Sequence, residues 1–154
     1  MISSERKFAE DAALVLESMG LARAHGKLLA WLLVCDPPHQ SSTELAAALD
    51  LSAGSVSTGA RFLENARLIR RVAVPGRRGK AYELNPKGLI VASQDDRVRR
   101  VRELMDQGIG VVGDEHSSRA GRLRRLRDYY AFMEREIPAL IERFHAEYGE
   151  AGNG

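Results

Sequence analysis

Apolar residues recur at helical spacing over the first part of the chain. The first such stretch predicts a helix from about Ser4 to Met19, with an inner face formed by Phe8, Ala12, Val15, Leu16 and Met19. Gly20 then suits the positive φ that the residue past a helix end adopts. A second helix is predicted from about Arg23 to Cys35, because apolar residues occupy most of its sides and two prolines follow it.

Two short helices, each with its own start signal, are predicted between residues 41 and 65. Ser41 and Glu44 have the spacing of a capping box, in which each side chain accepts from the other's free backbone N–H. Ser52 is a suitable N-cap for the second of these helices. That helix has an apolar stripe of Val56, Ala60 and Leu63, and an opposite polar side of Gly54, Ser57, Thr58, Arg61 and Asn65. Gly59 is expected to allow a close crossing against the preceding short helix.

A β-hairpin is predicted directly after these helices. Residues that suit two short strands are Val72 and Val74, then Tyr82 and Leu84. The turn between the strands, residues 75–80, contains two glycines and three cations. The order of short helix, turn, second helix and basic hairpin is typical of a winged helix-turn-helix.

The remainder of the chain is predicted to be helical. A fifth helix is expected over residues 89–105, broken or loosened by Gly108, Gly110 and Gly113, and a last helix from about Ser118 to Tyr148, with a kink or restart at Pro138. Apolar residues of the last helix alternate in steps of three and four: Leu123, Leu126, Tyr130, Met133, Ile137, Leu140 and Phe144. Such a stripe is a seam for a partner helix, so we expect dimerisation through it. Packing onto the first helix of the same chain is the alternative, and the two arrangements can coexist.

Charge is distributed unevenly along the chain. The formal net charge is only +2, but residues 67–80 contain six basic residues and no acidic one: Arg67, Arg70, Arg71, Arg77, Arg78 and Lys80. A local basic patch in a nearly neutral chain suits contact with nucleic-acid phosphates. We expect the three cations at the hairpin tip to reach the minor groove or flanking phosphates, and the three before it to contact the DNA backbone.

The polar side of the helix that begins near Ser52 supplies the candidates for reading bases in the major groove of duplex DNA. Arg61 is the best candidate for a specific contact, because arginine prefers guanine O6 and N7; contact with phosphate alone is the alternative. Ser55, Ser57 and Thr58 are more tolerant partners. Gly54, at the helix start, can approach a phosphate.

These elements indicate a mainly α fold class: a winged helix-turn-helix with a two-stranded β wing and long C-terminal dimerisation helices. Residues 1–88 are expected to form the DNA-binding domain with its N-terminal helix, residues 89–148 a helical dimerisation region, and residues 149–154 a flexible tail. The length of 154 residues suits one small domain with an assembly element.

The sequence contains no signature of catalysis or of a bound cofactor. No glycine-rich phosphate loop, nucleophile elbow or metal-ligand spacing is present, so we expect no enzyme activity, metal or cofactor. The single cysteine, Cys35, is expected to be a small buried hydrophobe rather than a redox sensor. No signal peptide is visible and the longest apolar run, Leu28 to Cys35, is too short to span a bilayer, so we expect a cytoplasmic protein without membrane contact.

Five segments resemble the GbsR branch of the MarR-type transcriptional regulators. They are ESMGL at 17–21, WLLVCDPP at 31–38, STELA at 42–46, SVST at 55–58 and LRDYYAF at 126–132. The resemblance extends over nearly the whole chain. It implies a homodimer of two winged domains with packed terminal helices, acting as a transcriptional repressor or regulator. It also implies control by a small-molecule effector, which is choline in the best-known member of the branch.

We therefore predict a sequence-specific DNA-binding transcriptional regulator that acts as a homodimeric repressor under effector control. The alternative is a winged-helix protein-interaction adaptor without specific DNA binding, which would not need the basic residues between Arg67 and Lys80. Candidates for an effector cavity that holds a cation by ring faces are Trp31, Tyr129, Tyr130 and Phe132, with core packing as their alternative role.

Overall fold

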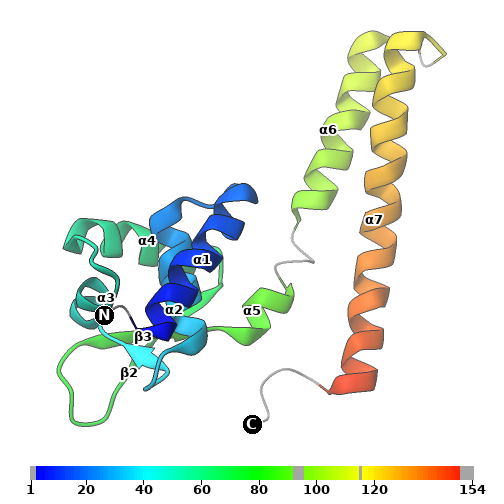
Figure 1. Ribbon diagram of the computed structural model, residues 1–154. Coiled ribbons are helices and arrows are strands. Elements are labelled where there is room, and N and C mark those ends of the chain that lie inside the picture. The colour runs from blue at the N-terminus through cyan, green and yellow to red at the C-terminus, as the bar shows by residue number, and fades with distance from the viewer. Residues whose placement is uncertain (1–2, 92–95, 115, 150–154) are drawn as a thin grey trace. The chain divides into compact units, whose positions relative to one another are not determined.

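The computed structural model describes residues 3–91, 96–114 and 116–149. Within them the chain is mainly α-helical with one small antiparallel sheet (Figure 1), as the sequence predicted. In chain order the elements are α1 (Ser4–Ser18), α2 (Arg23–Val34), β1 (His39–Gln40), α3 (Ser42–Leu49), α4 (Ala53–Asn65), β2 (Ile69–Ala73), β3 (Lys80–Leu84), α5 (Pro86–Val91), α6 (Arg97–Val112) and α7 (Ser118–Tyr148). The chain divides into two compact units, residues 1–89 and residues 90–154. Of the expected tail, residues 150–154 lie outside the described residues.

Side-chain caps fix the starts of the two short helices. The predicted capping box is present: Ser41 Oγ accepts from the Glu44 N–H at 3.2 Å, and Glu44 Oε2 accepts from the Ser41 N–H at 2.7 Å. Ser52 Oγ accepts from the Ser55 N–H at 3.1 Å, which confirms Ser52 as the N-cap of α4. Asp50, at φ 54 in the left-handed region, ends α3 and leads the chain directly into α4. Each such cap stabilises its helix by about 1 kcal/mol.

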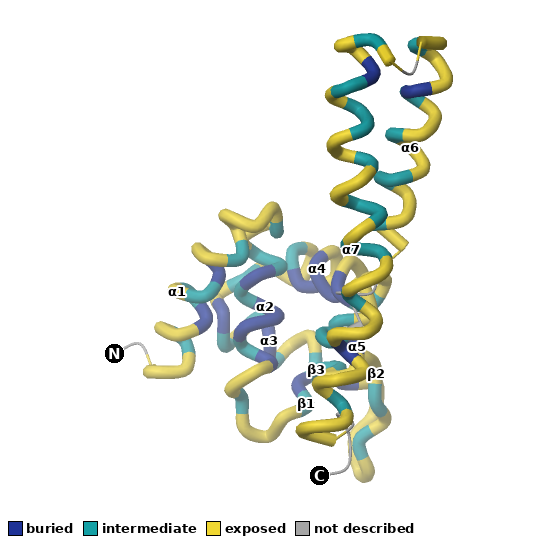
Figure 2. The backbone as a smooth tube through the Cα atoms, turned by 90° about the vertical axis from the view of Figure 1, so that its right-hand side faces the viewer, coloured by how far each residue is buried: buried dark blue, intermediate teal, exposed yellow. Residues whose placement is uncertain are grey.

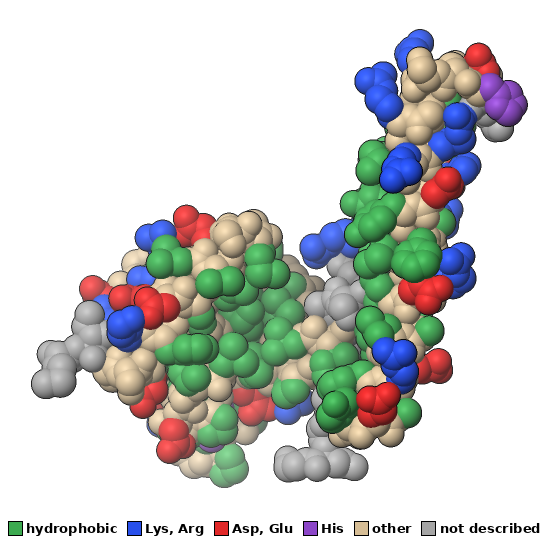
Figure 3. Space-filling model, turned by 45° about the vertical axis from the view of Figure 1, so that its right-hand side comes forward, with side chains coloured by type: hydrophobic (Ala, Val, Ile, Leu, Met, Phe, Trp, Pro, Cys, Tyr) green, Lys and Arg blue, Asp and Glu red, His purple; other side chains and the backbone are tan. Residues whose placement is uncertain are grey.

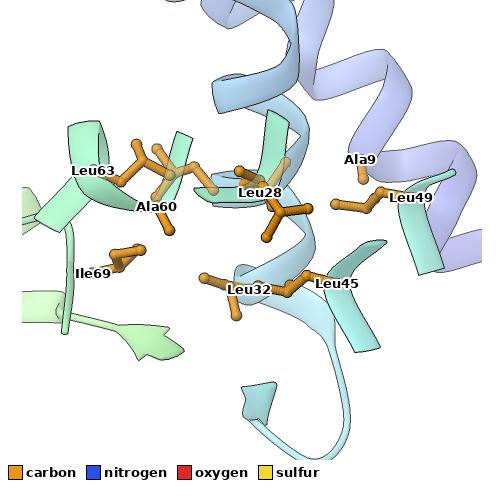
Figure 4. Packing of buried hydrophobic residues seen from close by; sticks show 11 residues of the cluster. Ala9, Leu28, Leu32, Leu45, Leu49, Ala60, Leu63 and Ile69 are labelled. Atoms are coloured by element: carbon orange, nitrogen blue, oxygen red, sulfur yellow. The ribbon is translucent and has the colours of Figure 1, made fainter. Parts of the chain in front are cut away.

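Helix α2 lies at the centre of the core of the N-terminal unit. Its Leu28, Leu29, Ala30 and Leu32 are buried. The buried residues packed around them are Ala9, Leu45, Leu49, Val56, Ala60, Leu63 and Ile69. In Figure 4, Leu28 lies between side chains of α3 and side chains of α4. Burial of each large aliphatic side chain contributes roughly 1.5–3 kcal/mol, so this cluster fixes the positions of α3 and α4 against α2.

Gly59 permits a close helix crossing, but with α2 and not with α3 as the sequence suggested. A Cβ placed on Gly59 would lie 2.4 Å from Leu28 Cδ1 and 3.1 Å from His25 Cδ2. The prediction named the wrong neighbour because the spacing of small residues shows that a helix comes close without showing which helix it is.

The outer apolar residues of α1 and α2 are more exposed than the sequence suggested. The predicted inner face of α1 is wrong at Val15 and Met19, which are 62% and 76% exposed, and at Phe8, whereas Ala9 and Ala13 are fully buried. Small residues face α2 because the two helices cross closely: a Cβ on Gly26 of α2 would lie 3.2 Å from Ala13 Cα. Figure 2 shows α1 largely exposed, with few buried positions, next to the more extensively buried α2.

The wing belongs to a three-stranded sheet of order β1-β3-β2, not to a two-stranded one. The predicted hairpin is present, with Ile69 paired to Leu84 and Ala73 paired to Lys80, but Val74 lies beyond β2. The additional strand β1 pairs His39 with Glu83 and Gln40 with Tyr82. Two residues are too few to show an alternating pattern, so this strand has no signal in the sequence.

The helices of the C-terminal unit follow the prediction in part. Residues expected in one fifth helix belong to α5 and α6, with residues 92–95 outside the described part of the chain. Gly108 and Gly110 do not break α6, which continues to its C-cap at Gly113, where φ is 77. A Cβ on Gly108 would lie 3.2 Å from Leu123 Cδ1, so this glycine allows α6 to approach α7. Helix α7 continues across Pro138 without a restart.

The predicted seam of α7 divides between two environments. Helix α6 packs along α7 in the same unit (Figure 1), and Leu123, Tyr130, Met133 and Ile137 are half-buried. Leu126, Leu140 and Phe144 stay exposed within the single chain. Two hydrogen bonds from the Arg102 guanidinium to the Glu134 carboxylate also join the two helices.

Replacing Leu63 with alanine should destabilise the N-terminal unit by about 2–5 kcal/mol, because the side chain is fully buried between α4 and its neighbours. Denaturant unfolding followed by circular dichroism measures the loss. The control is Thr58→Ala, an exposed position on the same helix. Equal losses in the two variants would contradict the packing described above.

Candidate nucleic-acid interface

Helix α4 has one buried side and one solvent-exposed side. Val56, Ala60 and Leu63 are buried in the core, whereas Ser57, Thr58 and Arg61 are exposed. The separation follows from helical geometry, because successive residues turn by about 100° around the axis. The polar residues that the sequence singled out therefore point to solvent, where a DNA groove can reach them.

The first turn of α4 contains the cap as well as the remaining candidates. Gly54 is exposed, and a Cβ there would have only Ser52 Oγ within 4 Å. Ser55 is half-buried, and its hydroxyl lies 2.9 Å from the Ser52 hydroxyl while its N–H is bonded to that oxygen. Ser55 therefore takes part in the cap, which distinguishes it from Ser57 and Thr58.

The wing is the turn between β2 and β3, residues 74–79. Gly76 and Gly79 have φ of 78 and 84, values that glycine adopts without steric cost. The Arg77 N–H donates to Val74 O at 3.1 Å and closes the turn. The exposed side chains of Arg77, Arg78 and Lys80 all come from this turn or from the first residue of β3.

Three of the six patch cations are paired with carboxylates of neighbouring elements. Arg70 Nη2 lies 2.7 Å from Glu83 Oε1, and Arg71 Nε lies 3.0 Å from Glu64 Oε1. Arg77 binds both oxygens of Glu44, as described below.

The other patch cations, Arg67, Arg78 and Lys80, have no carboxylate partner among the described residues, and neither does Arg61 of α4. Arg67 has φ 60, and its carbonyl oxygen accepts from Asn85 Nδ2 at 3.0 Å. Its guanidinium remains exposed. The structure thus separates the basic patch into paired arginines and free cations.

Glu44 combines two roles that the sequence showed only in part. Its Oε2 accepts from the Ser41 N–H and also from Arg77 Nη1 at 3.0 Å, and its Oε1 accepts from Arg77 Nη2 at 2.8 Å. The hydrogen bonds from Arg77, followed by the one from the Ser41 backbone, lower the pKa of Glu44 from 4.5 to about 2. The capping-box spacing identified Glu44, but its partner is 33 residues away and has no sequence signal.

Phe62 is a residue near the candidate interface that the sequence analysis did not single out. It lies on α4 beside Arg61, is partly exposed, and stacks on His25 of α2 with ring centroids 4.8 Å apart. The stack extends the α2–α4 contact to the edge of the candidate interface.

The described residues contain no group of three or more His, Cys, Asp or Glu side chains placed to hold a metal ion. Across the same residues, no helix combines the length and apolar character that crossing a membrane requires. Cys35 is half-buried, and burial raises the pKa of its thiol. The cytoplasmic location stays a prediction.

An exposed polar helix beside a basic hairpin, on a tightly packed helix-turn-helix, defines a winged-helix DNA-binding protein. A family model described as the MmpR5-like MarR family transcriptional regulator matches residues 89–147. The HTH-type transcriptional regulator MmpR5 of Mycobacterium tuberculosis is 41% identical over 147 residues, an alignment that covers 94% of this chain and 88% of that protein. A solved structure described as the crystal structure of a transcriptional regulator matches with a TM-score of 0.81 and 38% identity, covering 94% of this chain and 99% of the other.

The chain therefore belongs to the MarR family of transcriptional regulators, in its MmpR5-like group. This is a family of DNA-binding transcriptional regulators, as the sequence predicted, and not a family of enzymes. The expected absence of enzyme activity in this chain stays a prediction.

The titration of Glu44 should report its bond to Arg77. We expect its carboxyl carbon in NMR spectra to titrate with a midpoint of about pH 2 in the native protein. Since the pKa is lowered on folding, the ionised carboxylate contributes stability that is fully present above about pH 4.5 and is lost as the pH falls towards 2. In Arg77→Gln the midpoint should rise towards 4.5. An unchanged midpoint in that variant would show that Arg77 is not the main cause.

Proposed function

We propose that this MarR-family regulator represses transcription by binding a specific duplex operator as a homodimer. The observation that carries the proposal is the exposure of Ser57, Thr58 and Arg61 on α4 while the opposite side of the helix is buried. An α-helix with such a polar side fits the major groove of B-DNA, where each base pair presents a distinct pattern of donors and acceptors.

The side chains divide into base-reading and phosphate-binding groups under this proposal. Arg61 contacts a guanine through its two parallel donors, and Ser57 and Thr58 contact neighbouring base edges. The exposed start of α4 at Gly54 approaches a phosphate, because free N–H groups point outward there. Arg78 and Lys80 reach the minor groove or its flanking phosphates.

The remaining patch arginines contact the DNA backbone in the same proposal. Arg67 is free of carboxylate partners among the described residues, so its whole charge is available to a phosphate. Arg70 and Arg71 keep further N–H donors beyond those that their glutamate partners accept. Their contribution to binding should therefore be smaller than that of Arg67.

Dimerisation through α7 is supported by the apolar residues that this helix leaves exposed. They include Leu126, Tyr129, Phe132, Leu140 and Phe144. Figure 3 shows hydrophobic side chains gathered along one side of the helical pair. In a twofold dimer a second copy covers this side, and two α4 helices then read half-sites about 34 Å apart or a multiple of that spacing.

Control by a small-molecule effector is the last part of the proposal. An apolar hollow of about 440 Å³ in the C-terminal unit supports it. Its lining includes Leu140 and Phe144 of the proposed dimer seam, so under this proposal the effector binds next to the second copy. An effector that binds one dimer conformation better than another shifts the spacing of the two α4 helices. Membership of the GbsR branch, and with it a choline-like ligand, stays a prediction.

DNA binding should weaken steeply with salt, with a slope of log K against log salt of about −0.9 for each phosphate neutralised. The operator is first selected from random duplex DNA, and binding is then measured by fluorescence anisotropy at several salt concentrations. If the native protein selects and retains no duplex DNA even at low salt, the protein-interaction adaptor is favoured instead. Retention of DNA after Arg78→Glu with Lys80→Glu would show that the wing does not contact DNA.

Replacing Arg61 with alanine should cost about 1–3 kcal/mol of binding to the selected operator and relax the preference at one base position. The same operator and its single-base variants are compared for the native protein and the variant. If binding to all sequences weakens equally, Arg61 contacts only phosphate.

Replacing Leu126 with lysine should shift the protein from dimer towards monomer, because a charge would then replace an apolar side chain at the proposed interface. Sedimentation velocity over a range of concentrations measures the shift. Ala146→Lys is the matched control, since Ala146 is also exposed on α7 but lies on a different side of the helix. A similar loss of dimer in both variants would argue against this seam.

A further inference from the structure

Among the described residues, hydrogen bonds between one pair of side chains, Arg77 and Glu44, join the wing to the start of α3. Arg77 Nη1 and Nη2 donate to separate oxygens of Glu44, at 3.0 and 2.8 Å. A two-point contact of this kind fixes the orientation of the guanidinium plane as well as its distance. The contact joins the tip of the wing to the first turn of the helix that precedes α4.

The backbone of the wing indicates that this contact restrains a flexible turn. Gly76 and Gly79 lie on either side of Arg77 and Arg78 with positive φ, and glycine, which lacks a Cβ, has more accessible backbone conformations than other residues. The Arg77 side chain reaches from this turn to a helix terminus that is already fixed by the capping box. The pair therefore connects a segment of high conformational freedom to a rigid one.

The charge of Arg77 is balanced within the molecule. Glu44 remains ionised at neutral pH, since its pKa is about 2, and both of its oxygens face the guanidinium. A cation neutralised in this way has little remaining attraction for a DNA phosphate. Arg78, the next residue, has no carboxylate partner among the residues that the structure describes.

We infer that Arg77 is a positioning residue that holds the wing against α3, and that Glu44 promotes DNA binding although it is acidic. The inference rests on one part of the proposed function, namely that the wing contacts DNA. Arg78 and Lys80 then make the contacts that the sequence assigned equally to all three wing cations. Because the Arg77–Glu44 pair already restrains the turn in the free protein, the turn loses less conformational entropy on binding DNA. The affinity for DNA is therefore higher without any added contact.

The Glu44→Gln substitution distinguishes this positioning role from a direct contact of Arg77 with DNA, because the two roles predict opposite changes in DNA affinity. Glu44→Gln keeps an oxygen for the Ser41 N–H, because glutamine also serves in capping boxes, but it removes the charge that holds Arg77. If Arg77 contacts DNA directly, the substitution frees a cation and removes an anion, so binding should become tighter. If Arg77 positions the wing, binding should become weaker.

The experiment measures operator affinity and its salt dependence for Glu44→Gln, Arg77→Gln, the double variant and Arg78→Gln. We expect each variant of the Glu44–Arg77 pair to bind about three- to fivefold more weakly, with the double variant no weaker than either single one. Their salt slopes should equal that of the native protein. Arg78→Gln should flatten the slope by about 0.9, because it removes a phosphate contact.

Either of two results would overturn the inference: affinity in Glu44→Gln that equals or exceeds the native value, or a slope in Arg77→Gln as flat as that in Arg78→Gln. Hydrogen exchange of the Arg77 amide, which is bonded to Val74 O, adds a readout in the free protein. Exchange should accelerate in Glu44→Gln and stay unchanged in Arg78→Gln. This measurement tests the attachment of the wing even if the native protein binds no DNA, a result that would contradict only the proposed function.

Discussion

The candidate nucleic-acid interface depends on how closely α4 crosses α2. The crossing occurs at Gly59, where an added Cβ would lie 2.4 Å from Leu28 Cδ1, so the buried Leu28 side chain would have to move to make room for it. It places Val56, Ala60 and Leu63 in the core, and the geometry of the helix then leaves Ser57, Thr58 and Arg61 in solvent. The apolar contact that stabilises the unit is thus also the contact that sets the direction of the polar side chains.

Ion pairs divide the basic patch into two groups of cations. Glu83, Glu64 and Glu44 each bind one arginine, so Arg70, Arg71 and Arg77 have part of their charge balanced within the protein. Arg61, Arg67, Arg78 and Lys80 have no carboxylate partner in the described part of the chain. A surface built in this way combines a rigid frame with a small number of free cations, which suits specific binding better than a uniformly charged patch does.

The C-terminal unit has few buried residues for its length. Among its described residues only Ile109, Ala120 and Ile141 are buried, while several aromatic side chains of α7 remain exposed. Two packed helices cover only their facing sides, so apolar residues elsewhere on α7 have no neighbour within the unit. This imbalance is the physical basis for proposing that a second copy completes it.

The sequence by itself determined what depends on near neighbours in the chain. The capping box at Ser41, the N-cap at Ser52 and the polar side of α4 all follow from residues within a few positions of one another, and each was predicted correctly. Tertiary structure alone decided which helix meets Gly59, that β1 joins the sheet, and that Glu44 binds Arg77. Those contacts join residues that are far apart in the chain. A periodic sequence pattern predicts that a side chain is buried or paired, but it does not predict which residue is its partner.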